Sequence, residues 1–312
     1  MAKKTFVHSS RGKGRPQILL IGNGLEYEIH QPSWDELVKK LKVDGAPELT
    51  EKEREQYPFP LLYEVLSTPA DAPAHLSAED IKAEEDRLAE VMKELNHSSN
   101  CNLDQLPSIG ADHIMTTNYS YCLETAFYPG RDFSKPHVRS RIRFSCGEKR
   151  ENHYRLHTGY LAGETGLWHI HGEAGATRSV VLGHDRYGRL LGKIVEICGA
   201  QTYDEEPTKK EFTSWPELFL YGDVYVLGFG FASCEFDLWW LLRRKQRERY
   251  SDGRVYFYER PEASGCTKPE HFLLRANGAV ILDAGMKPGC DYNAFYAAAI
   301  KDIRKKIEES RR

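Results

Sequence analysis

Residues 223–230 read Asp223-Val-Tyr-Val-Leu-Gly-Phe-Gly230, an apolar run that ends at two glycines. A short apolar run bounded by glycine is typical of a strand buried inside a sheet. The sequence that follows predicts a helix over 236–250 and a second strand over 255–258. Another strand is predicted over 278–282 and a closing helix over 295–307. Strands that alternate with helices need crossover connections, so this third of the chain predicts a mostly parallel, doubly wound α/β sheet.

The same alternation extends into the N-terminal half. Gln17-Ile-Leu-Leu-Ile21 is an apolar run that ends at Gly22 and Gly24, which predicts another buried strand. Apolar residues at helical spacing predict a helix over 34–41, and Ser33 before it is a suitable N-cap. On similar grounds we expect strands over 112–117, 167–172 and 179–182, and helices over 122–127 and 187–197.

Two segments interrupt this pattern and are interpreted as insertions. Five prolines break up residues 45–100, and a charged helix with a narrow apolar stripe is predicted from Ser77. The second segment holds strand-like pieces such as 141–144. A length of 312 residues fits about two domains or one α/β domain with insertions. We expect a flexible arm over 1–14 and a single Rossmann-like domain over 15–312, with helical insertions at about 45–110 and 129–164.

The composition argues against several classes of protein. Lys and Arg total 43 against 46 for Asp and Glu, so a chain built to neutralise nucleic-acid phosphates is not expected. The sequence has no run of about 18 apolar residues and no apolar segment typical of a secretory signal. Its seven cysteines are scattered without a CxxC pair, which argues against a zinc site or a disulfide framework. We therefore expect a cytoplasmic protein with reduced, buried cysteines and no metal. The basic run 243–249 is interpreted as a solvated helix face, with a partner or nucleic-acid contact as the alternative.

Glycine pairs follow two of the predicted strands. Gly22-Asn23-Gly24 allows backbone amides to approach a phosphate, although a simple tight turn is the alternative. Gly228-Phe229-Gly230, with Ser233 shortly after it, is the second pair. Neither has the third glycine of the dinucleotide fingerprint, but two such strand ends suit the two halves of a dinucleotide. Glu259 follows the next strand, where an acidic residue can accept hydrogen bonds from a ribose diol.

Polar residues follow two other strands. Thr117-Asn118-Tyr119 offers an amide that can position a sugar hydroxyl or a water, while a helix N-cap is the alternative role for Asn118. Strand alternation places His169 and His171 on one face, and an imidazole there is suited to proton transfer. The alternatives are a hydrogen-bonded core histidine and half of a metal site.

Taken together, these segments resemble the sirtuin-like (SIR2-like) family, in particular its zinc-free branch in prokaryotic anti-phage defence proteins. The resemblance covers about residues 17–285 apart from the insertions. The matching segments are, in family order, Gly22-Asn-Gly24 with Pro32-Ser-Trp34, Thr116-Thr-Asn-Tyr119, His171-Gly172, Val181-Leu-Gly-His-Asp-Arg-Tyr187, Leu227-Gly-Phe-Gly-Phe231, Cys234-Glu-Phe-Asp237 and Trp240-Leu-Leu242.

The resemblance implies that NAD lies across the strand ends as the substrate. It places the pyrophosphate over Gly22, Asn23 and Gly24. It places Asn118 near the nicotinamide ribose and makes His171 the general base on a ribose hydroxyl or the attacking water. By the same resemblance, the remaining contacts come from Thr117 and Tyr119, from Gly228, Phe229, Gly230 and Ser233 on the ribose-phosphate side, and from Glu259 or Tyr258 at the adenosine ribose.

Three features depart from the family pattern. The zinc-binding cysteine pairs of sirtuin deacylases are missing from the sequence, which weakens a deacylase interpretation. Ser120 stands where an aspartate commonly follows Asn-Tyr, and Glu26 replaces a small polar residue after the first glycine pair.

The resemblance implies an NAD glycohydrolase that yields ADP-ribose and nicotinamide. It also implies a homo-oligomer that is kept quiet until a trigger or a regulatory protein partner changes its assembly. The alternatives are an NAD-dependent protein deacylase and a nucleotide-sensing or scaffold module without catalysis.

Overall fold

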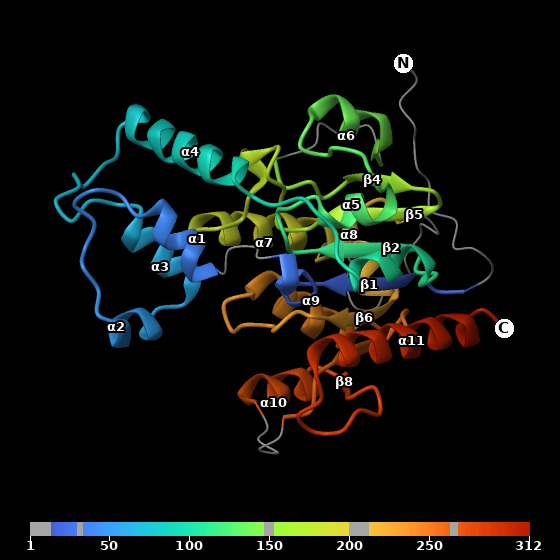
Figure 1. The fold of residues 1–312 in the computed structure, drawn as a ribbon. Helices are drawn as coiled ribbons and strands as arrows, with labels where there is room; N and C mark the ends of the chain where they lie inside the picture. Colours follow the sequence, from blue (N-terminus) through green and yellow to red (C-terminus); the bar gives the residue numbers. More distant parts are fainter. Residues whose placement is uncertain (1–13, 30–33, 147–152, 200–211, 263–267) are drawn as a thin grey trace.

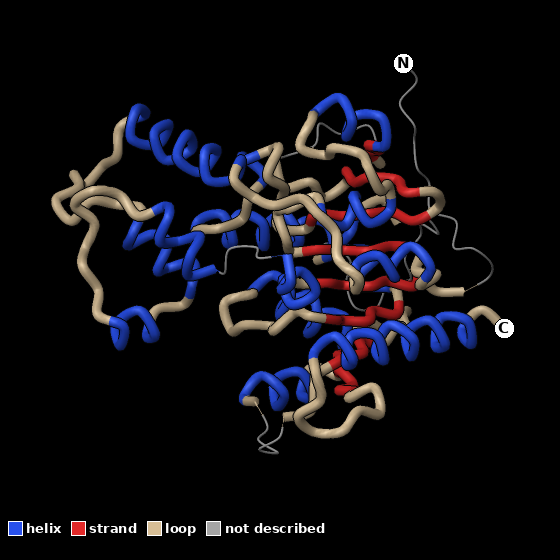
Figure 2. Tube along the Cα trace, viewed as in Figure 1, coloured by secondary structure: helices blue, strands red, loops and turns tan. Residues whose placement is uncertain are grey.

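A computed structural model describes residues 14–29, 34–146, 153–199, 212–262 and 268–312. Its centre is an eight-stranded sheet in the order β3-β4-β5-β2-β1-β6-β7-β8 (Figures 1 and 2). The strands are β1 (Gln17–Ile21), β2 (His113–Thr116), β3 (Arg143–Ser145), β4 (Thr158–Ala162), β5 (Thr165–His169), β6 (Asp223–Leu227), β7 (Val255–Tyr258) and β8 (Ala279–Leu282).

Six of these strands run parallel, and only the β3-β4-β5 end of the described sheet is antiparallel. The chain passes from β1 to β2 on one side and returns later to β6 on the other side of β1. This reversal is the topological switch point at which open α/β sheets bind ligands beyond their carboxyl ends. The predicted Rossmann-like α/β fold is confirmed.

Helices cover both faces of the sheet because its central strands are apolar on both sides. Ile18 and Leu20 of β1 pack in one cluster with α7, α8 and α9, while Leu19 and Ile21 pack in another with α5 and α11. The helices are α1 (Trp34–Leu41), α2 (Glu51–Gln56), α3 (Phe59–Leu66), α4 (Ala78–Lys93), α5 (Cys122–Phe127), α6 (Pro136–Ile142), α7 (His184–Cys198), α8 (Trp215–Tyr221), α9 (Phe236–Gln246), α10 (Pro269–Ala276) and α11 (Tyr292–Ser310), with short 3-10 helices η1 (Asn23–Ile29), η2 (Leu103–Ser108) and η3 (Thr177–Ser179).

The helices expected between residues 45 and 110 are present. Together with α1 they form a group beside the sheet (Figure 1), with a third apolar cluster between them. Helix α4 begins after Ser77, whose capping box with Asp80 satisfies the first backbone amides. Tyr119 and Leu182 join this third cluster, so the helical group packs against segments that follow the sheet strands.

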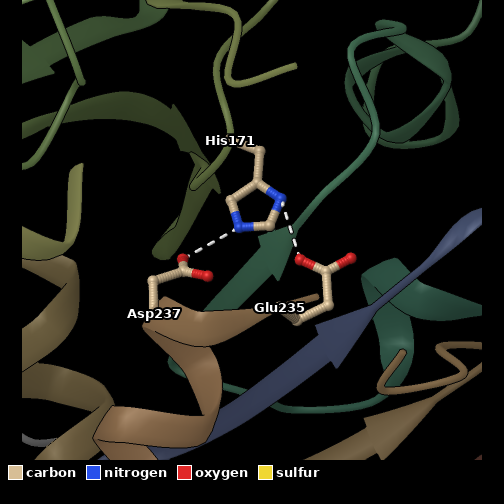
Figure 3. A group of neighbouring side chains, drawn as sticks. All are labelled: His171, Glu235 and Asp237. Carbon is tan, nitrogen blue, oxygen red and sulfur yellow. Dashed lines mark hydrogen bonds and ion pairs between the residues drawn. The ribbon is translucent and has the colours of Figure 1, made fainter. Parts of the chain in front are cut away.

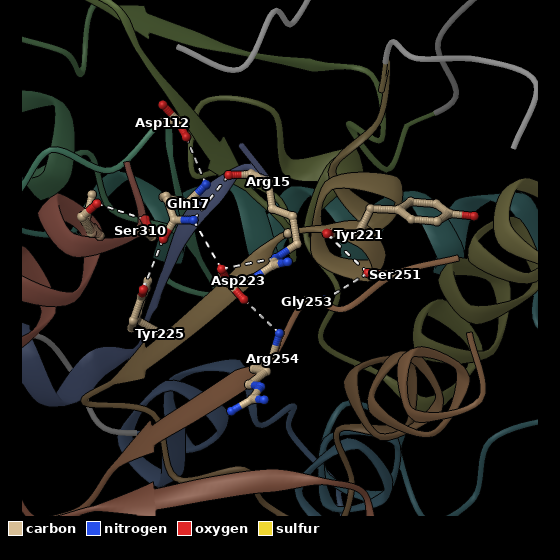
Figure 4. Close-up of polar contacts among 12 residues, drawn as sticks. Arg15, Gln17, Asp112, Tyr221, Asp223, Tyr225, Ser251, Gly253, Arg254 and Ser310 are labelled. Atoms are coloured by element: carbon tan, nitrogen blue, oxygen red, sulfur yellow. Dashed lines mark hydrogen bonds and ion pairs between the residues drawn. The ribbon is translucent and has the colours of Figure 1, made fainter. Parts of the chain in front are cut away.

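Polar side chains fix the amino ends of the central strands (Figure 4). Asp112 accepts a hydrogen bond from the amide of Gln17 at 2.8 Å, and the Gln17 side chain donates to Asp223 at 3.2 Å. The hydroxyl of Tyr225 donates to the Gln17 side chain at 3.0 Å. These bonds join the amino ends of β1, β2 and β6. They therefore fix the register of these strands at the amino-terminal edge of the sheet.

Several predicted boundaries are wrong. The predicted strand at 179–182 is not present: Ser179 ends η3, and the next three residues form irregular chain. Val180, Val181 and Leu182 are apolar because they pack into two clusters, and the amide of Val181 bonds to the carbonyl of His171. Helix α9 ends at Gln246, and the piece at 141–144 is divided between α6 and β3. Helices α8 and α10 were not predicted from the sequence. Ser33 and all of the predicted arm except Gly14 lie outside the described residues.

The basic run 243–249 is only partly a solvated face, which corrects the prediction. Arg244 is buried and pairs with buried Glu248 at 2.8 Å. The ammonium of buried Lys245 donates to the carbonyls of Phe219 and Leu220, at the end of α8. Lys245 therefore joins α9 to α8, while Arg244 pairs within its own segment of the chain.

Two further predictions from the sequence concern the cysteines and membrane-spanning segments. The six cysteines that the structure describes are free, and four of them are buried. No helix in the described part of the chain is long and apolar enough to cross a membrane.

Candidate active site

Asn118 and His171 lie on neighbouring segments at the carboxyl edge of the sheet. Strands β2 and β5 pair with Thr116 opposite His169, and the amide of Ile170 continues the pairing to the carbonyl of Thr116 at 2.9 Å. Asn118 and His171 each follow that last pair by two residues. Both side chains are buried, with relative exposures of 7% and 0%. The sheet thus brings two residues 53 positions apart in the sequence to the same region.

A buried carboxylate holds the Asn118 side chain. The amide nitrogen of Asn118 donates to Glu26 Oε1 at 2.7 Å, and the Ser120 hydroxyl donates to Glu26 Oε2 at 2.7 Å. Burial raises the pKa of Glu26, although these two hydrogen bonds act in the opposite direction. The N-cap of α5 is Tyr121, so the alternative role of Asn118 as the cap of that helix is wrong.

The two positions that depart from the family pattern therefore contact each other. Glu26 belongs to η1, directly after the first glycine pair, and Ser120 follows the Asn118 motif. Together they keep one carboxylate beside Asn118, supplied from a different segment of the chain. No pattern in the sequence indicates that these two residues pair, because they stand 94 positions apart.

His169 has a structural role beneath Asn118. Its Nδ1 lies 2.9 Å from the backbone carbonyl of Asn118, and its Nε2 lies 2.9 Å from Glu124 Oε1. Burial by itself lowers the pKa of His169, but Glu124, with smaller contributions from Glu173 and the carbonyl of Asn118, outweighs burial and raises that pKa to about 9. A protonated His169 donates from both ring nitrogens. The alternative of a hydrogen-bonded core histidine is therefore correct for His169.

His171 lies between two other carboxylates (Figure 3). Its Nε2 is 2.9 Å from Asp237 Oδ2, and its Nδ1 is 3.8 Å from Glu235 Oε2. Burial lowers the pKa of His171, but these two carboxylates outweigh burial and raise it. The prediction that His169 and His171 share one face is wrong, because β5 ends at His169 and the two rings have different partners.

Gly172 allows the chain to turn immediately after His171. Its φ is +93°, and a Cβ at this position would lie 2.1 Å from the carbonyl oxygen of Ser179. Any other residue would meet both backbone strain and a steric clash. The position of the His171 ring therefore depends on this glycine.

The two predicted glycine pairs pack against each other. The amide of Gly24 donates to the carbonyl of Gly228 at 2.9 Å. A Cβ on Gly22 would lie 2.7 Å from the same carbonyl oxygen, and Gly228 itself has a φ of +65°. Close backbone packing explains Gly22, Gly24 and Gly228, whereas Gly230 has open space where a Cβ would lie. A phosphate contact at either pair stays a prediction.

The other predicted binding residues differ in exposure. Thr117 and Tyr119 are buried, and the Tyr119 hydroxyl donates to the carbonyl of Val181 at 2.8 Å. Phe229 is half-buried and packs edge-on against Phe231. Asn23 is half-buried, whereas Gly230 and Ser233 are exposed. Glu259 follows β7 and pairs with Lys268, so its carboxylate already has a cationic partner.

A cavity of about 430 Å³ lies beside the first glycine pair. Gly24 lines it together with Asn102, Asp291, Tyr292 and Tyr296. Gly24 is the one predicted site residue among its lining residues, so this cavity lies next to Asn23 but does not join Asn118 to His171.

One described group of side chains has ligand atoms close enough for a metal ion. His171, Glu235 and Asp237 offer three such atoms within 4.8 Å of one another. However, Asp237 and Glu235 face opposite nitrogens of the ring (Figure 3). One imidazole nitrogen and one oxygen of each carboxylate lie within that distance, so the three side chains could together hold an ion. The arrangement is compatible with an acid–histidine–acid cluster and with a metal centre, so the expected absence of a metal stays a prediction.

Comparison with known families gives one match. The family model described as the SIR2-like domain matches residues 112–279, more than half of the chain. The match covers Asn118, His169, His171, Glu235 and Asp237, while Glu26 lies before it. No curated protein matches the chain.

Proposed function

Because this chain belongs to the SIR2-like family, we propose that it is an NAD+ glycohydrolase that releases ADP-ribose and nicotinamide. One observation carries this proposal. Asn118 and His171 lie on adjacent segments beyond β2 and β5, and each is held by a buried carboxylate. An amide and an imidazole fixed in this way suit a reaction that must position a sugar and remove a proton.

The chemistry of the bond explains why so few groups are needed. Breaking the bond between nicotinamide and C1′ of the ribose builds positive charge on C1′, as in glycoside cleavage. Nicotinamide leaves as a neutral molecule and needs no strong acid. In our proposal Asn118 holds the ribose or the attacking water, and His171 accepts the proton that this water loses.

The remaining contacts with NAD follow the family resemblance. We place the pyrophosphate over Gly22, Asn23 and Gly24, and the nicotinamide ribose near Thr117, Asn118 and Tyr119. The ribose-phosphate side lies against Gly228, Phe229, Gly230 and Ser233, and the adenosine ribose near Glu259. Since Glu259 pairs with Lys268, a ribose diol there would share that carboxylate with the lysine.

We also propose that the chain belongs to the zinc-free, defence-associated branch and acts in the cytoplasm. Its sequence has no cysteine pair at zinc-binding spacing, which favours NAD hydrolysis over deacylation. Uncontrolled loss of NAD is toxic, so we expect a homo-oligomer that stays quiet until a trigger or a protein partner changes its assembly.

The test is chromatographic detection of nicotinamide and ADP-ribose after incubation of the purified chain with NAD+. We expect both products in equal amounts, unchanged by a chelator, and more of them once an activator is supplied. Turnover of acyl-peptides faster than NAD+ hydrolysis would replace the proposal with a deacylase. Tight NAD+ binding with no product under any activating condition would replace it with a sensing module.

The contact between Glu26 and Ser120 gives a prediction for this site. We expect Glu26→Ser to lower kcat by about 10²-fold, because Asn118 loses the acceptor that positions it. Adding Ser120→Asp returns a carboxylate to the same pair, and kcat should recover to within about tenfold of the wild type. Steady-state kinetics on both variants, with thermal unfolding curves alongside, test this compensation. A double variant as impaired as Glu26→Ser alone would show that the position of the carboxylate does not matter.

A further inference from the structure

The surroundings of His171 are asymmetric. Asp237 is fully buried and lies within hydrogen-bond distance of Nε2, whereas Glu235 is slightly exposed and lies 3.8 Å from Nδ1, too far for a hydrogen bond. Among the described residues, Nδ1 of His171 has no hydrogen-bond partner. The Tyr187 hydroxyl donates to Glu235 at 3.0 Å and keeps that side chain in place. Any opening of this cluster toward the surface is therefore on the Nδ1 side.

These contacts decide which nitrogen carries the proton. A neutral imidazole has one N–H, and an ionised carboxylate can only accept a hydrogen bond. Asp237 therefore keeps the proton of a neutral His171 on Nε2. The lone pair is then on Nδ1, a buried acceptor that lacks a donor in the described structure. An unsatisfied buried acceptor is costly unless a ligand supplies the missing donor.

We propose that Asp237 is a positioning residue that holds the proton of His171 on Nε2, so that Nδ1 is the atom that accepts a proton during catalysis. This inference rests on the proposed NAD+ hydrolysis. An attacking water beside Nδ1 gives its proton to that nitrogen while its oxygen bonds to C1′ of the ribose. The bond between C1′ and nicotinamide breaks, and its electron pair leaves with nicotinamide. Asp237 stabilises the imidazolium until His171 returns the proton to solvent on the Glu235 side.

A purely structural role for Asp237 predicts something different. As a residue of the first turn of α9, Asp237 could simply favour that helix end. Loss of such a role would lower stability and the amount of folded enzyme, with the pH dependence unchanged. A positioning role predicts a lower kcat at unchanged KM, together with a changed proton position on the ring.

The decisive variant is Asp237→Asn, which keeps the shape of the side chain. Its amide can donate to Nε2, which favours the tautomer with the proton on Nδ1 and blocks the base. We expect kcat to fall by about 10²-fold or more with KM within about threefold. Asp185→Asn is the matched control, since Asp185 is an exposed aspartate in the first turn of α7, and it should keep wild-type kinetics.

The pH profile gives a second measurement. The charges of Asp237 and Glu235 both raise the pKa of His171. Removing the charge of Asp237 lowers that pKa, so the acid limb of kcat should move to lower pH in any residual activity of Asp237→Asn. Full kcat with an unmoved acid limb in this variant would overturn the inference.

Nuclear magnetic resonance of ¹⁵N-labelled histidine tests the tautomer without NAD+ or turnover. At a pH above the pKa of His171, where the ring is neutral, we expect the wild-type chain to carry the proton on Nε2 and to have a bare Nδ1. The His171 signal is assigned by its loss in His171→Gln. This readout needs no folded Asp237 variant and separates the two hypotheses. If the chain never hydrolyses NAD+, the proposed function is wrong. If His171 nevertheless shows the predicted tautomer, the positioning role of Asp237 remains. A neutral ring with its proton on Nδ1, or a stoichiometric metal ion on that nitrogen, would overturn the positioning role itself.

Discussion

Replacing Asn118 or His171 with alanine is expected to lower NAD+ turnover by about 10²- to 10⁴-fold while the chain stays folded. The alanine at 118 removes the amide that positions the sugar, and the alanine at 171 removes the base. Each loss acts on the transition state, so kcat should fall far more than KM changes. Chromatographic rate measurements, paired with thermal unfolding curves, separate this effect from loss of folded protein.

Both alanine variants also leave buried carboxylates behind. Glu26 would lose the donor of Asn118, and Asp237 would lose its imidazole partner. We therefore expect some loss of stability and include His171→Gln, whose amide can still donate to Asp237. His137→Ala, an exposed histidine in the first turn of α6, serves as the control and should keep wild-type turnover. Full activity in both Asn118→Ala and His171→Ala would refute the assignment of these residues.

The parallel core of the fold is predictable from the sequence because its strands are buried on both faces. The run at 17–21 and the run at 223–227 are apolar at every or nearly every position, and they pair in the centre of the sheet. Residues 179–182 carry the same apolar signal, but it arises there from packing against two clusters. Apolar runs alone do not distinguish these two causes, which explains the wrong prediction of a strand.

The candidate site is predictable in outline only. Strand ends indicated Asn118 and His171, since polar residues after buried strands gather at one edge of a parallel sheet. Their carboxylate partners were not predicted, because Glu26 and Asp237 come from segments 92 and 66 positions away. Such pairs depend on how η1 and α9 pack onto the sheet, and no local pattern encodes that. The sequence contains a weaker indication of the partners of His171, since two acidic residues follow shortly after the second glycine pair.

The pair formed by His169 and Glu124 gives the largest expected effect on stability. We expect Glu124→Gln to lower the free energy of unfolding by about 3 kcal/mol near pH 6. Both partners are buried, and the pKa of His169 is raised to about 9 in the folded protein, against about 6.5 in the unfolded chain. Glutamine keeps the shape and can still hydrogen bond to a neutral imidazole, so the lost free energy reports mainly the charge.

The pH dependence of this effect follows from the direction of the pKa shift. A pKa that folding raises contributes stability below the unfolded value and loses it as the pH rises through the folded value. The difference between wild type and Glu124→Gln should therefore be full near pH 6 and small above about pH 9.5. Urea unfolding at both pH values measures it, and Glu90→Gln, which breaks the exposed pair of Glu90 with Lys93, should change stability little at either pH. An equal loss at pH 6 and pH 9.5 would mean that packing rather than charge holds His169. The carbonyl of Asn118 would then owe its position to the shape of the core and not to an ion pair beneath the site.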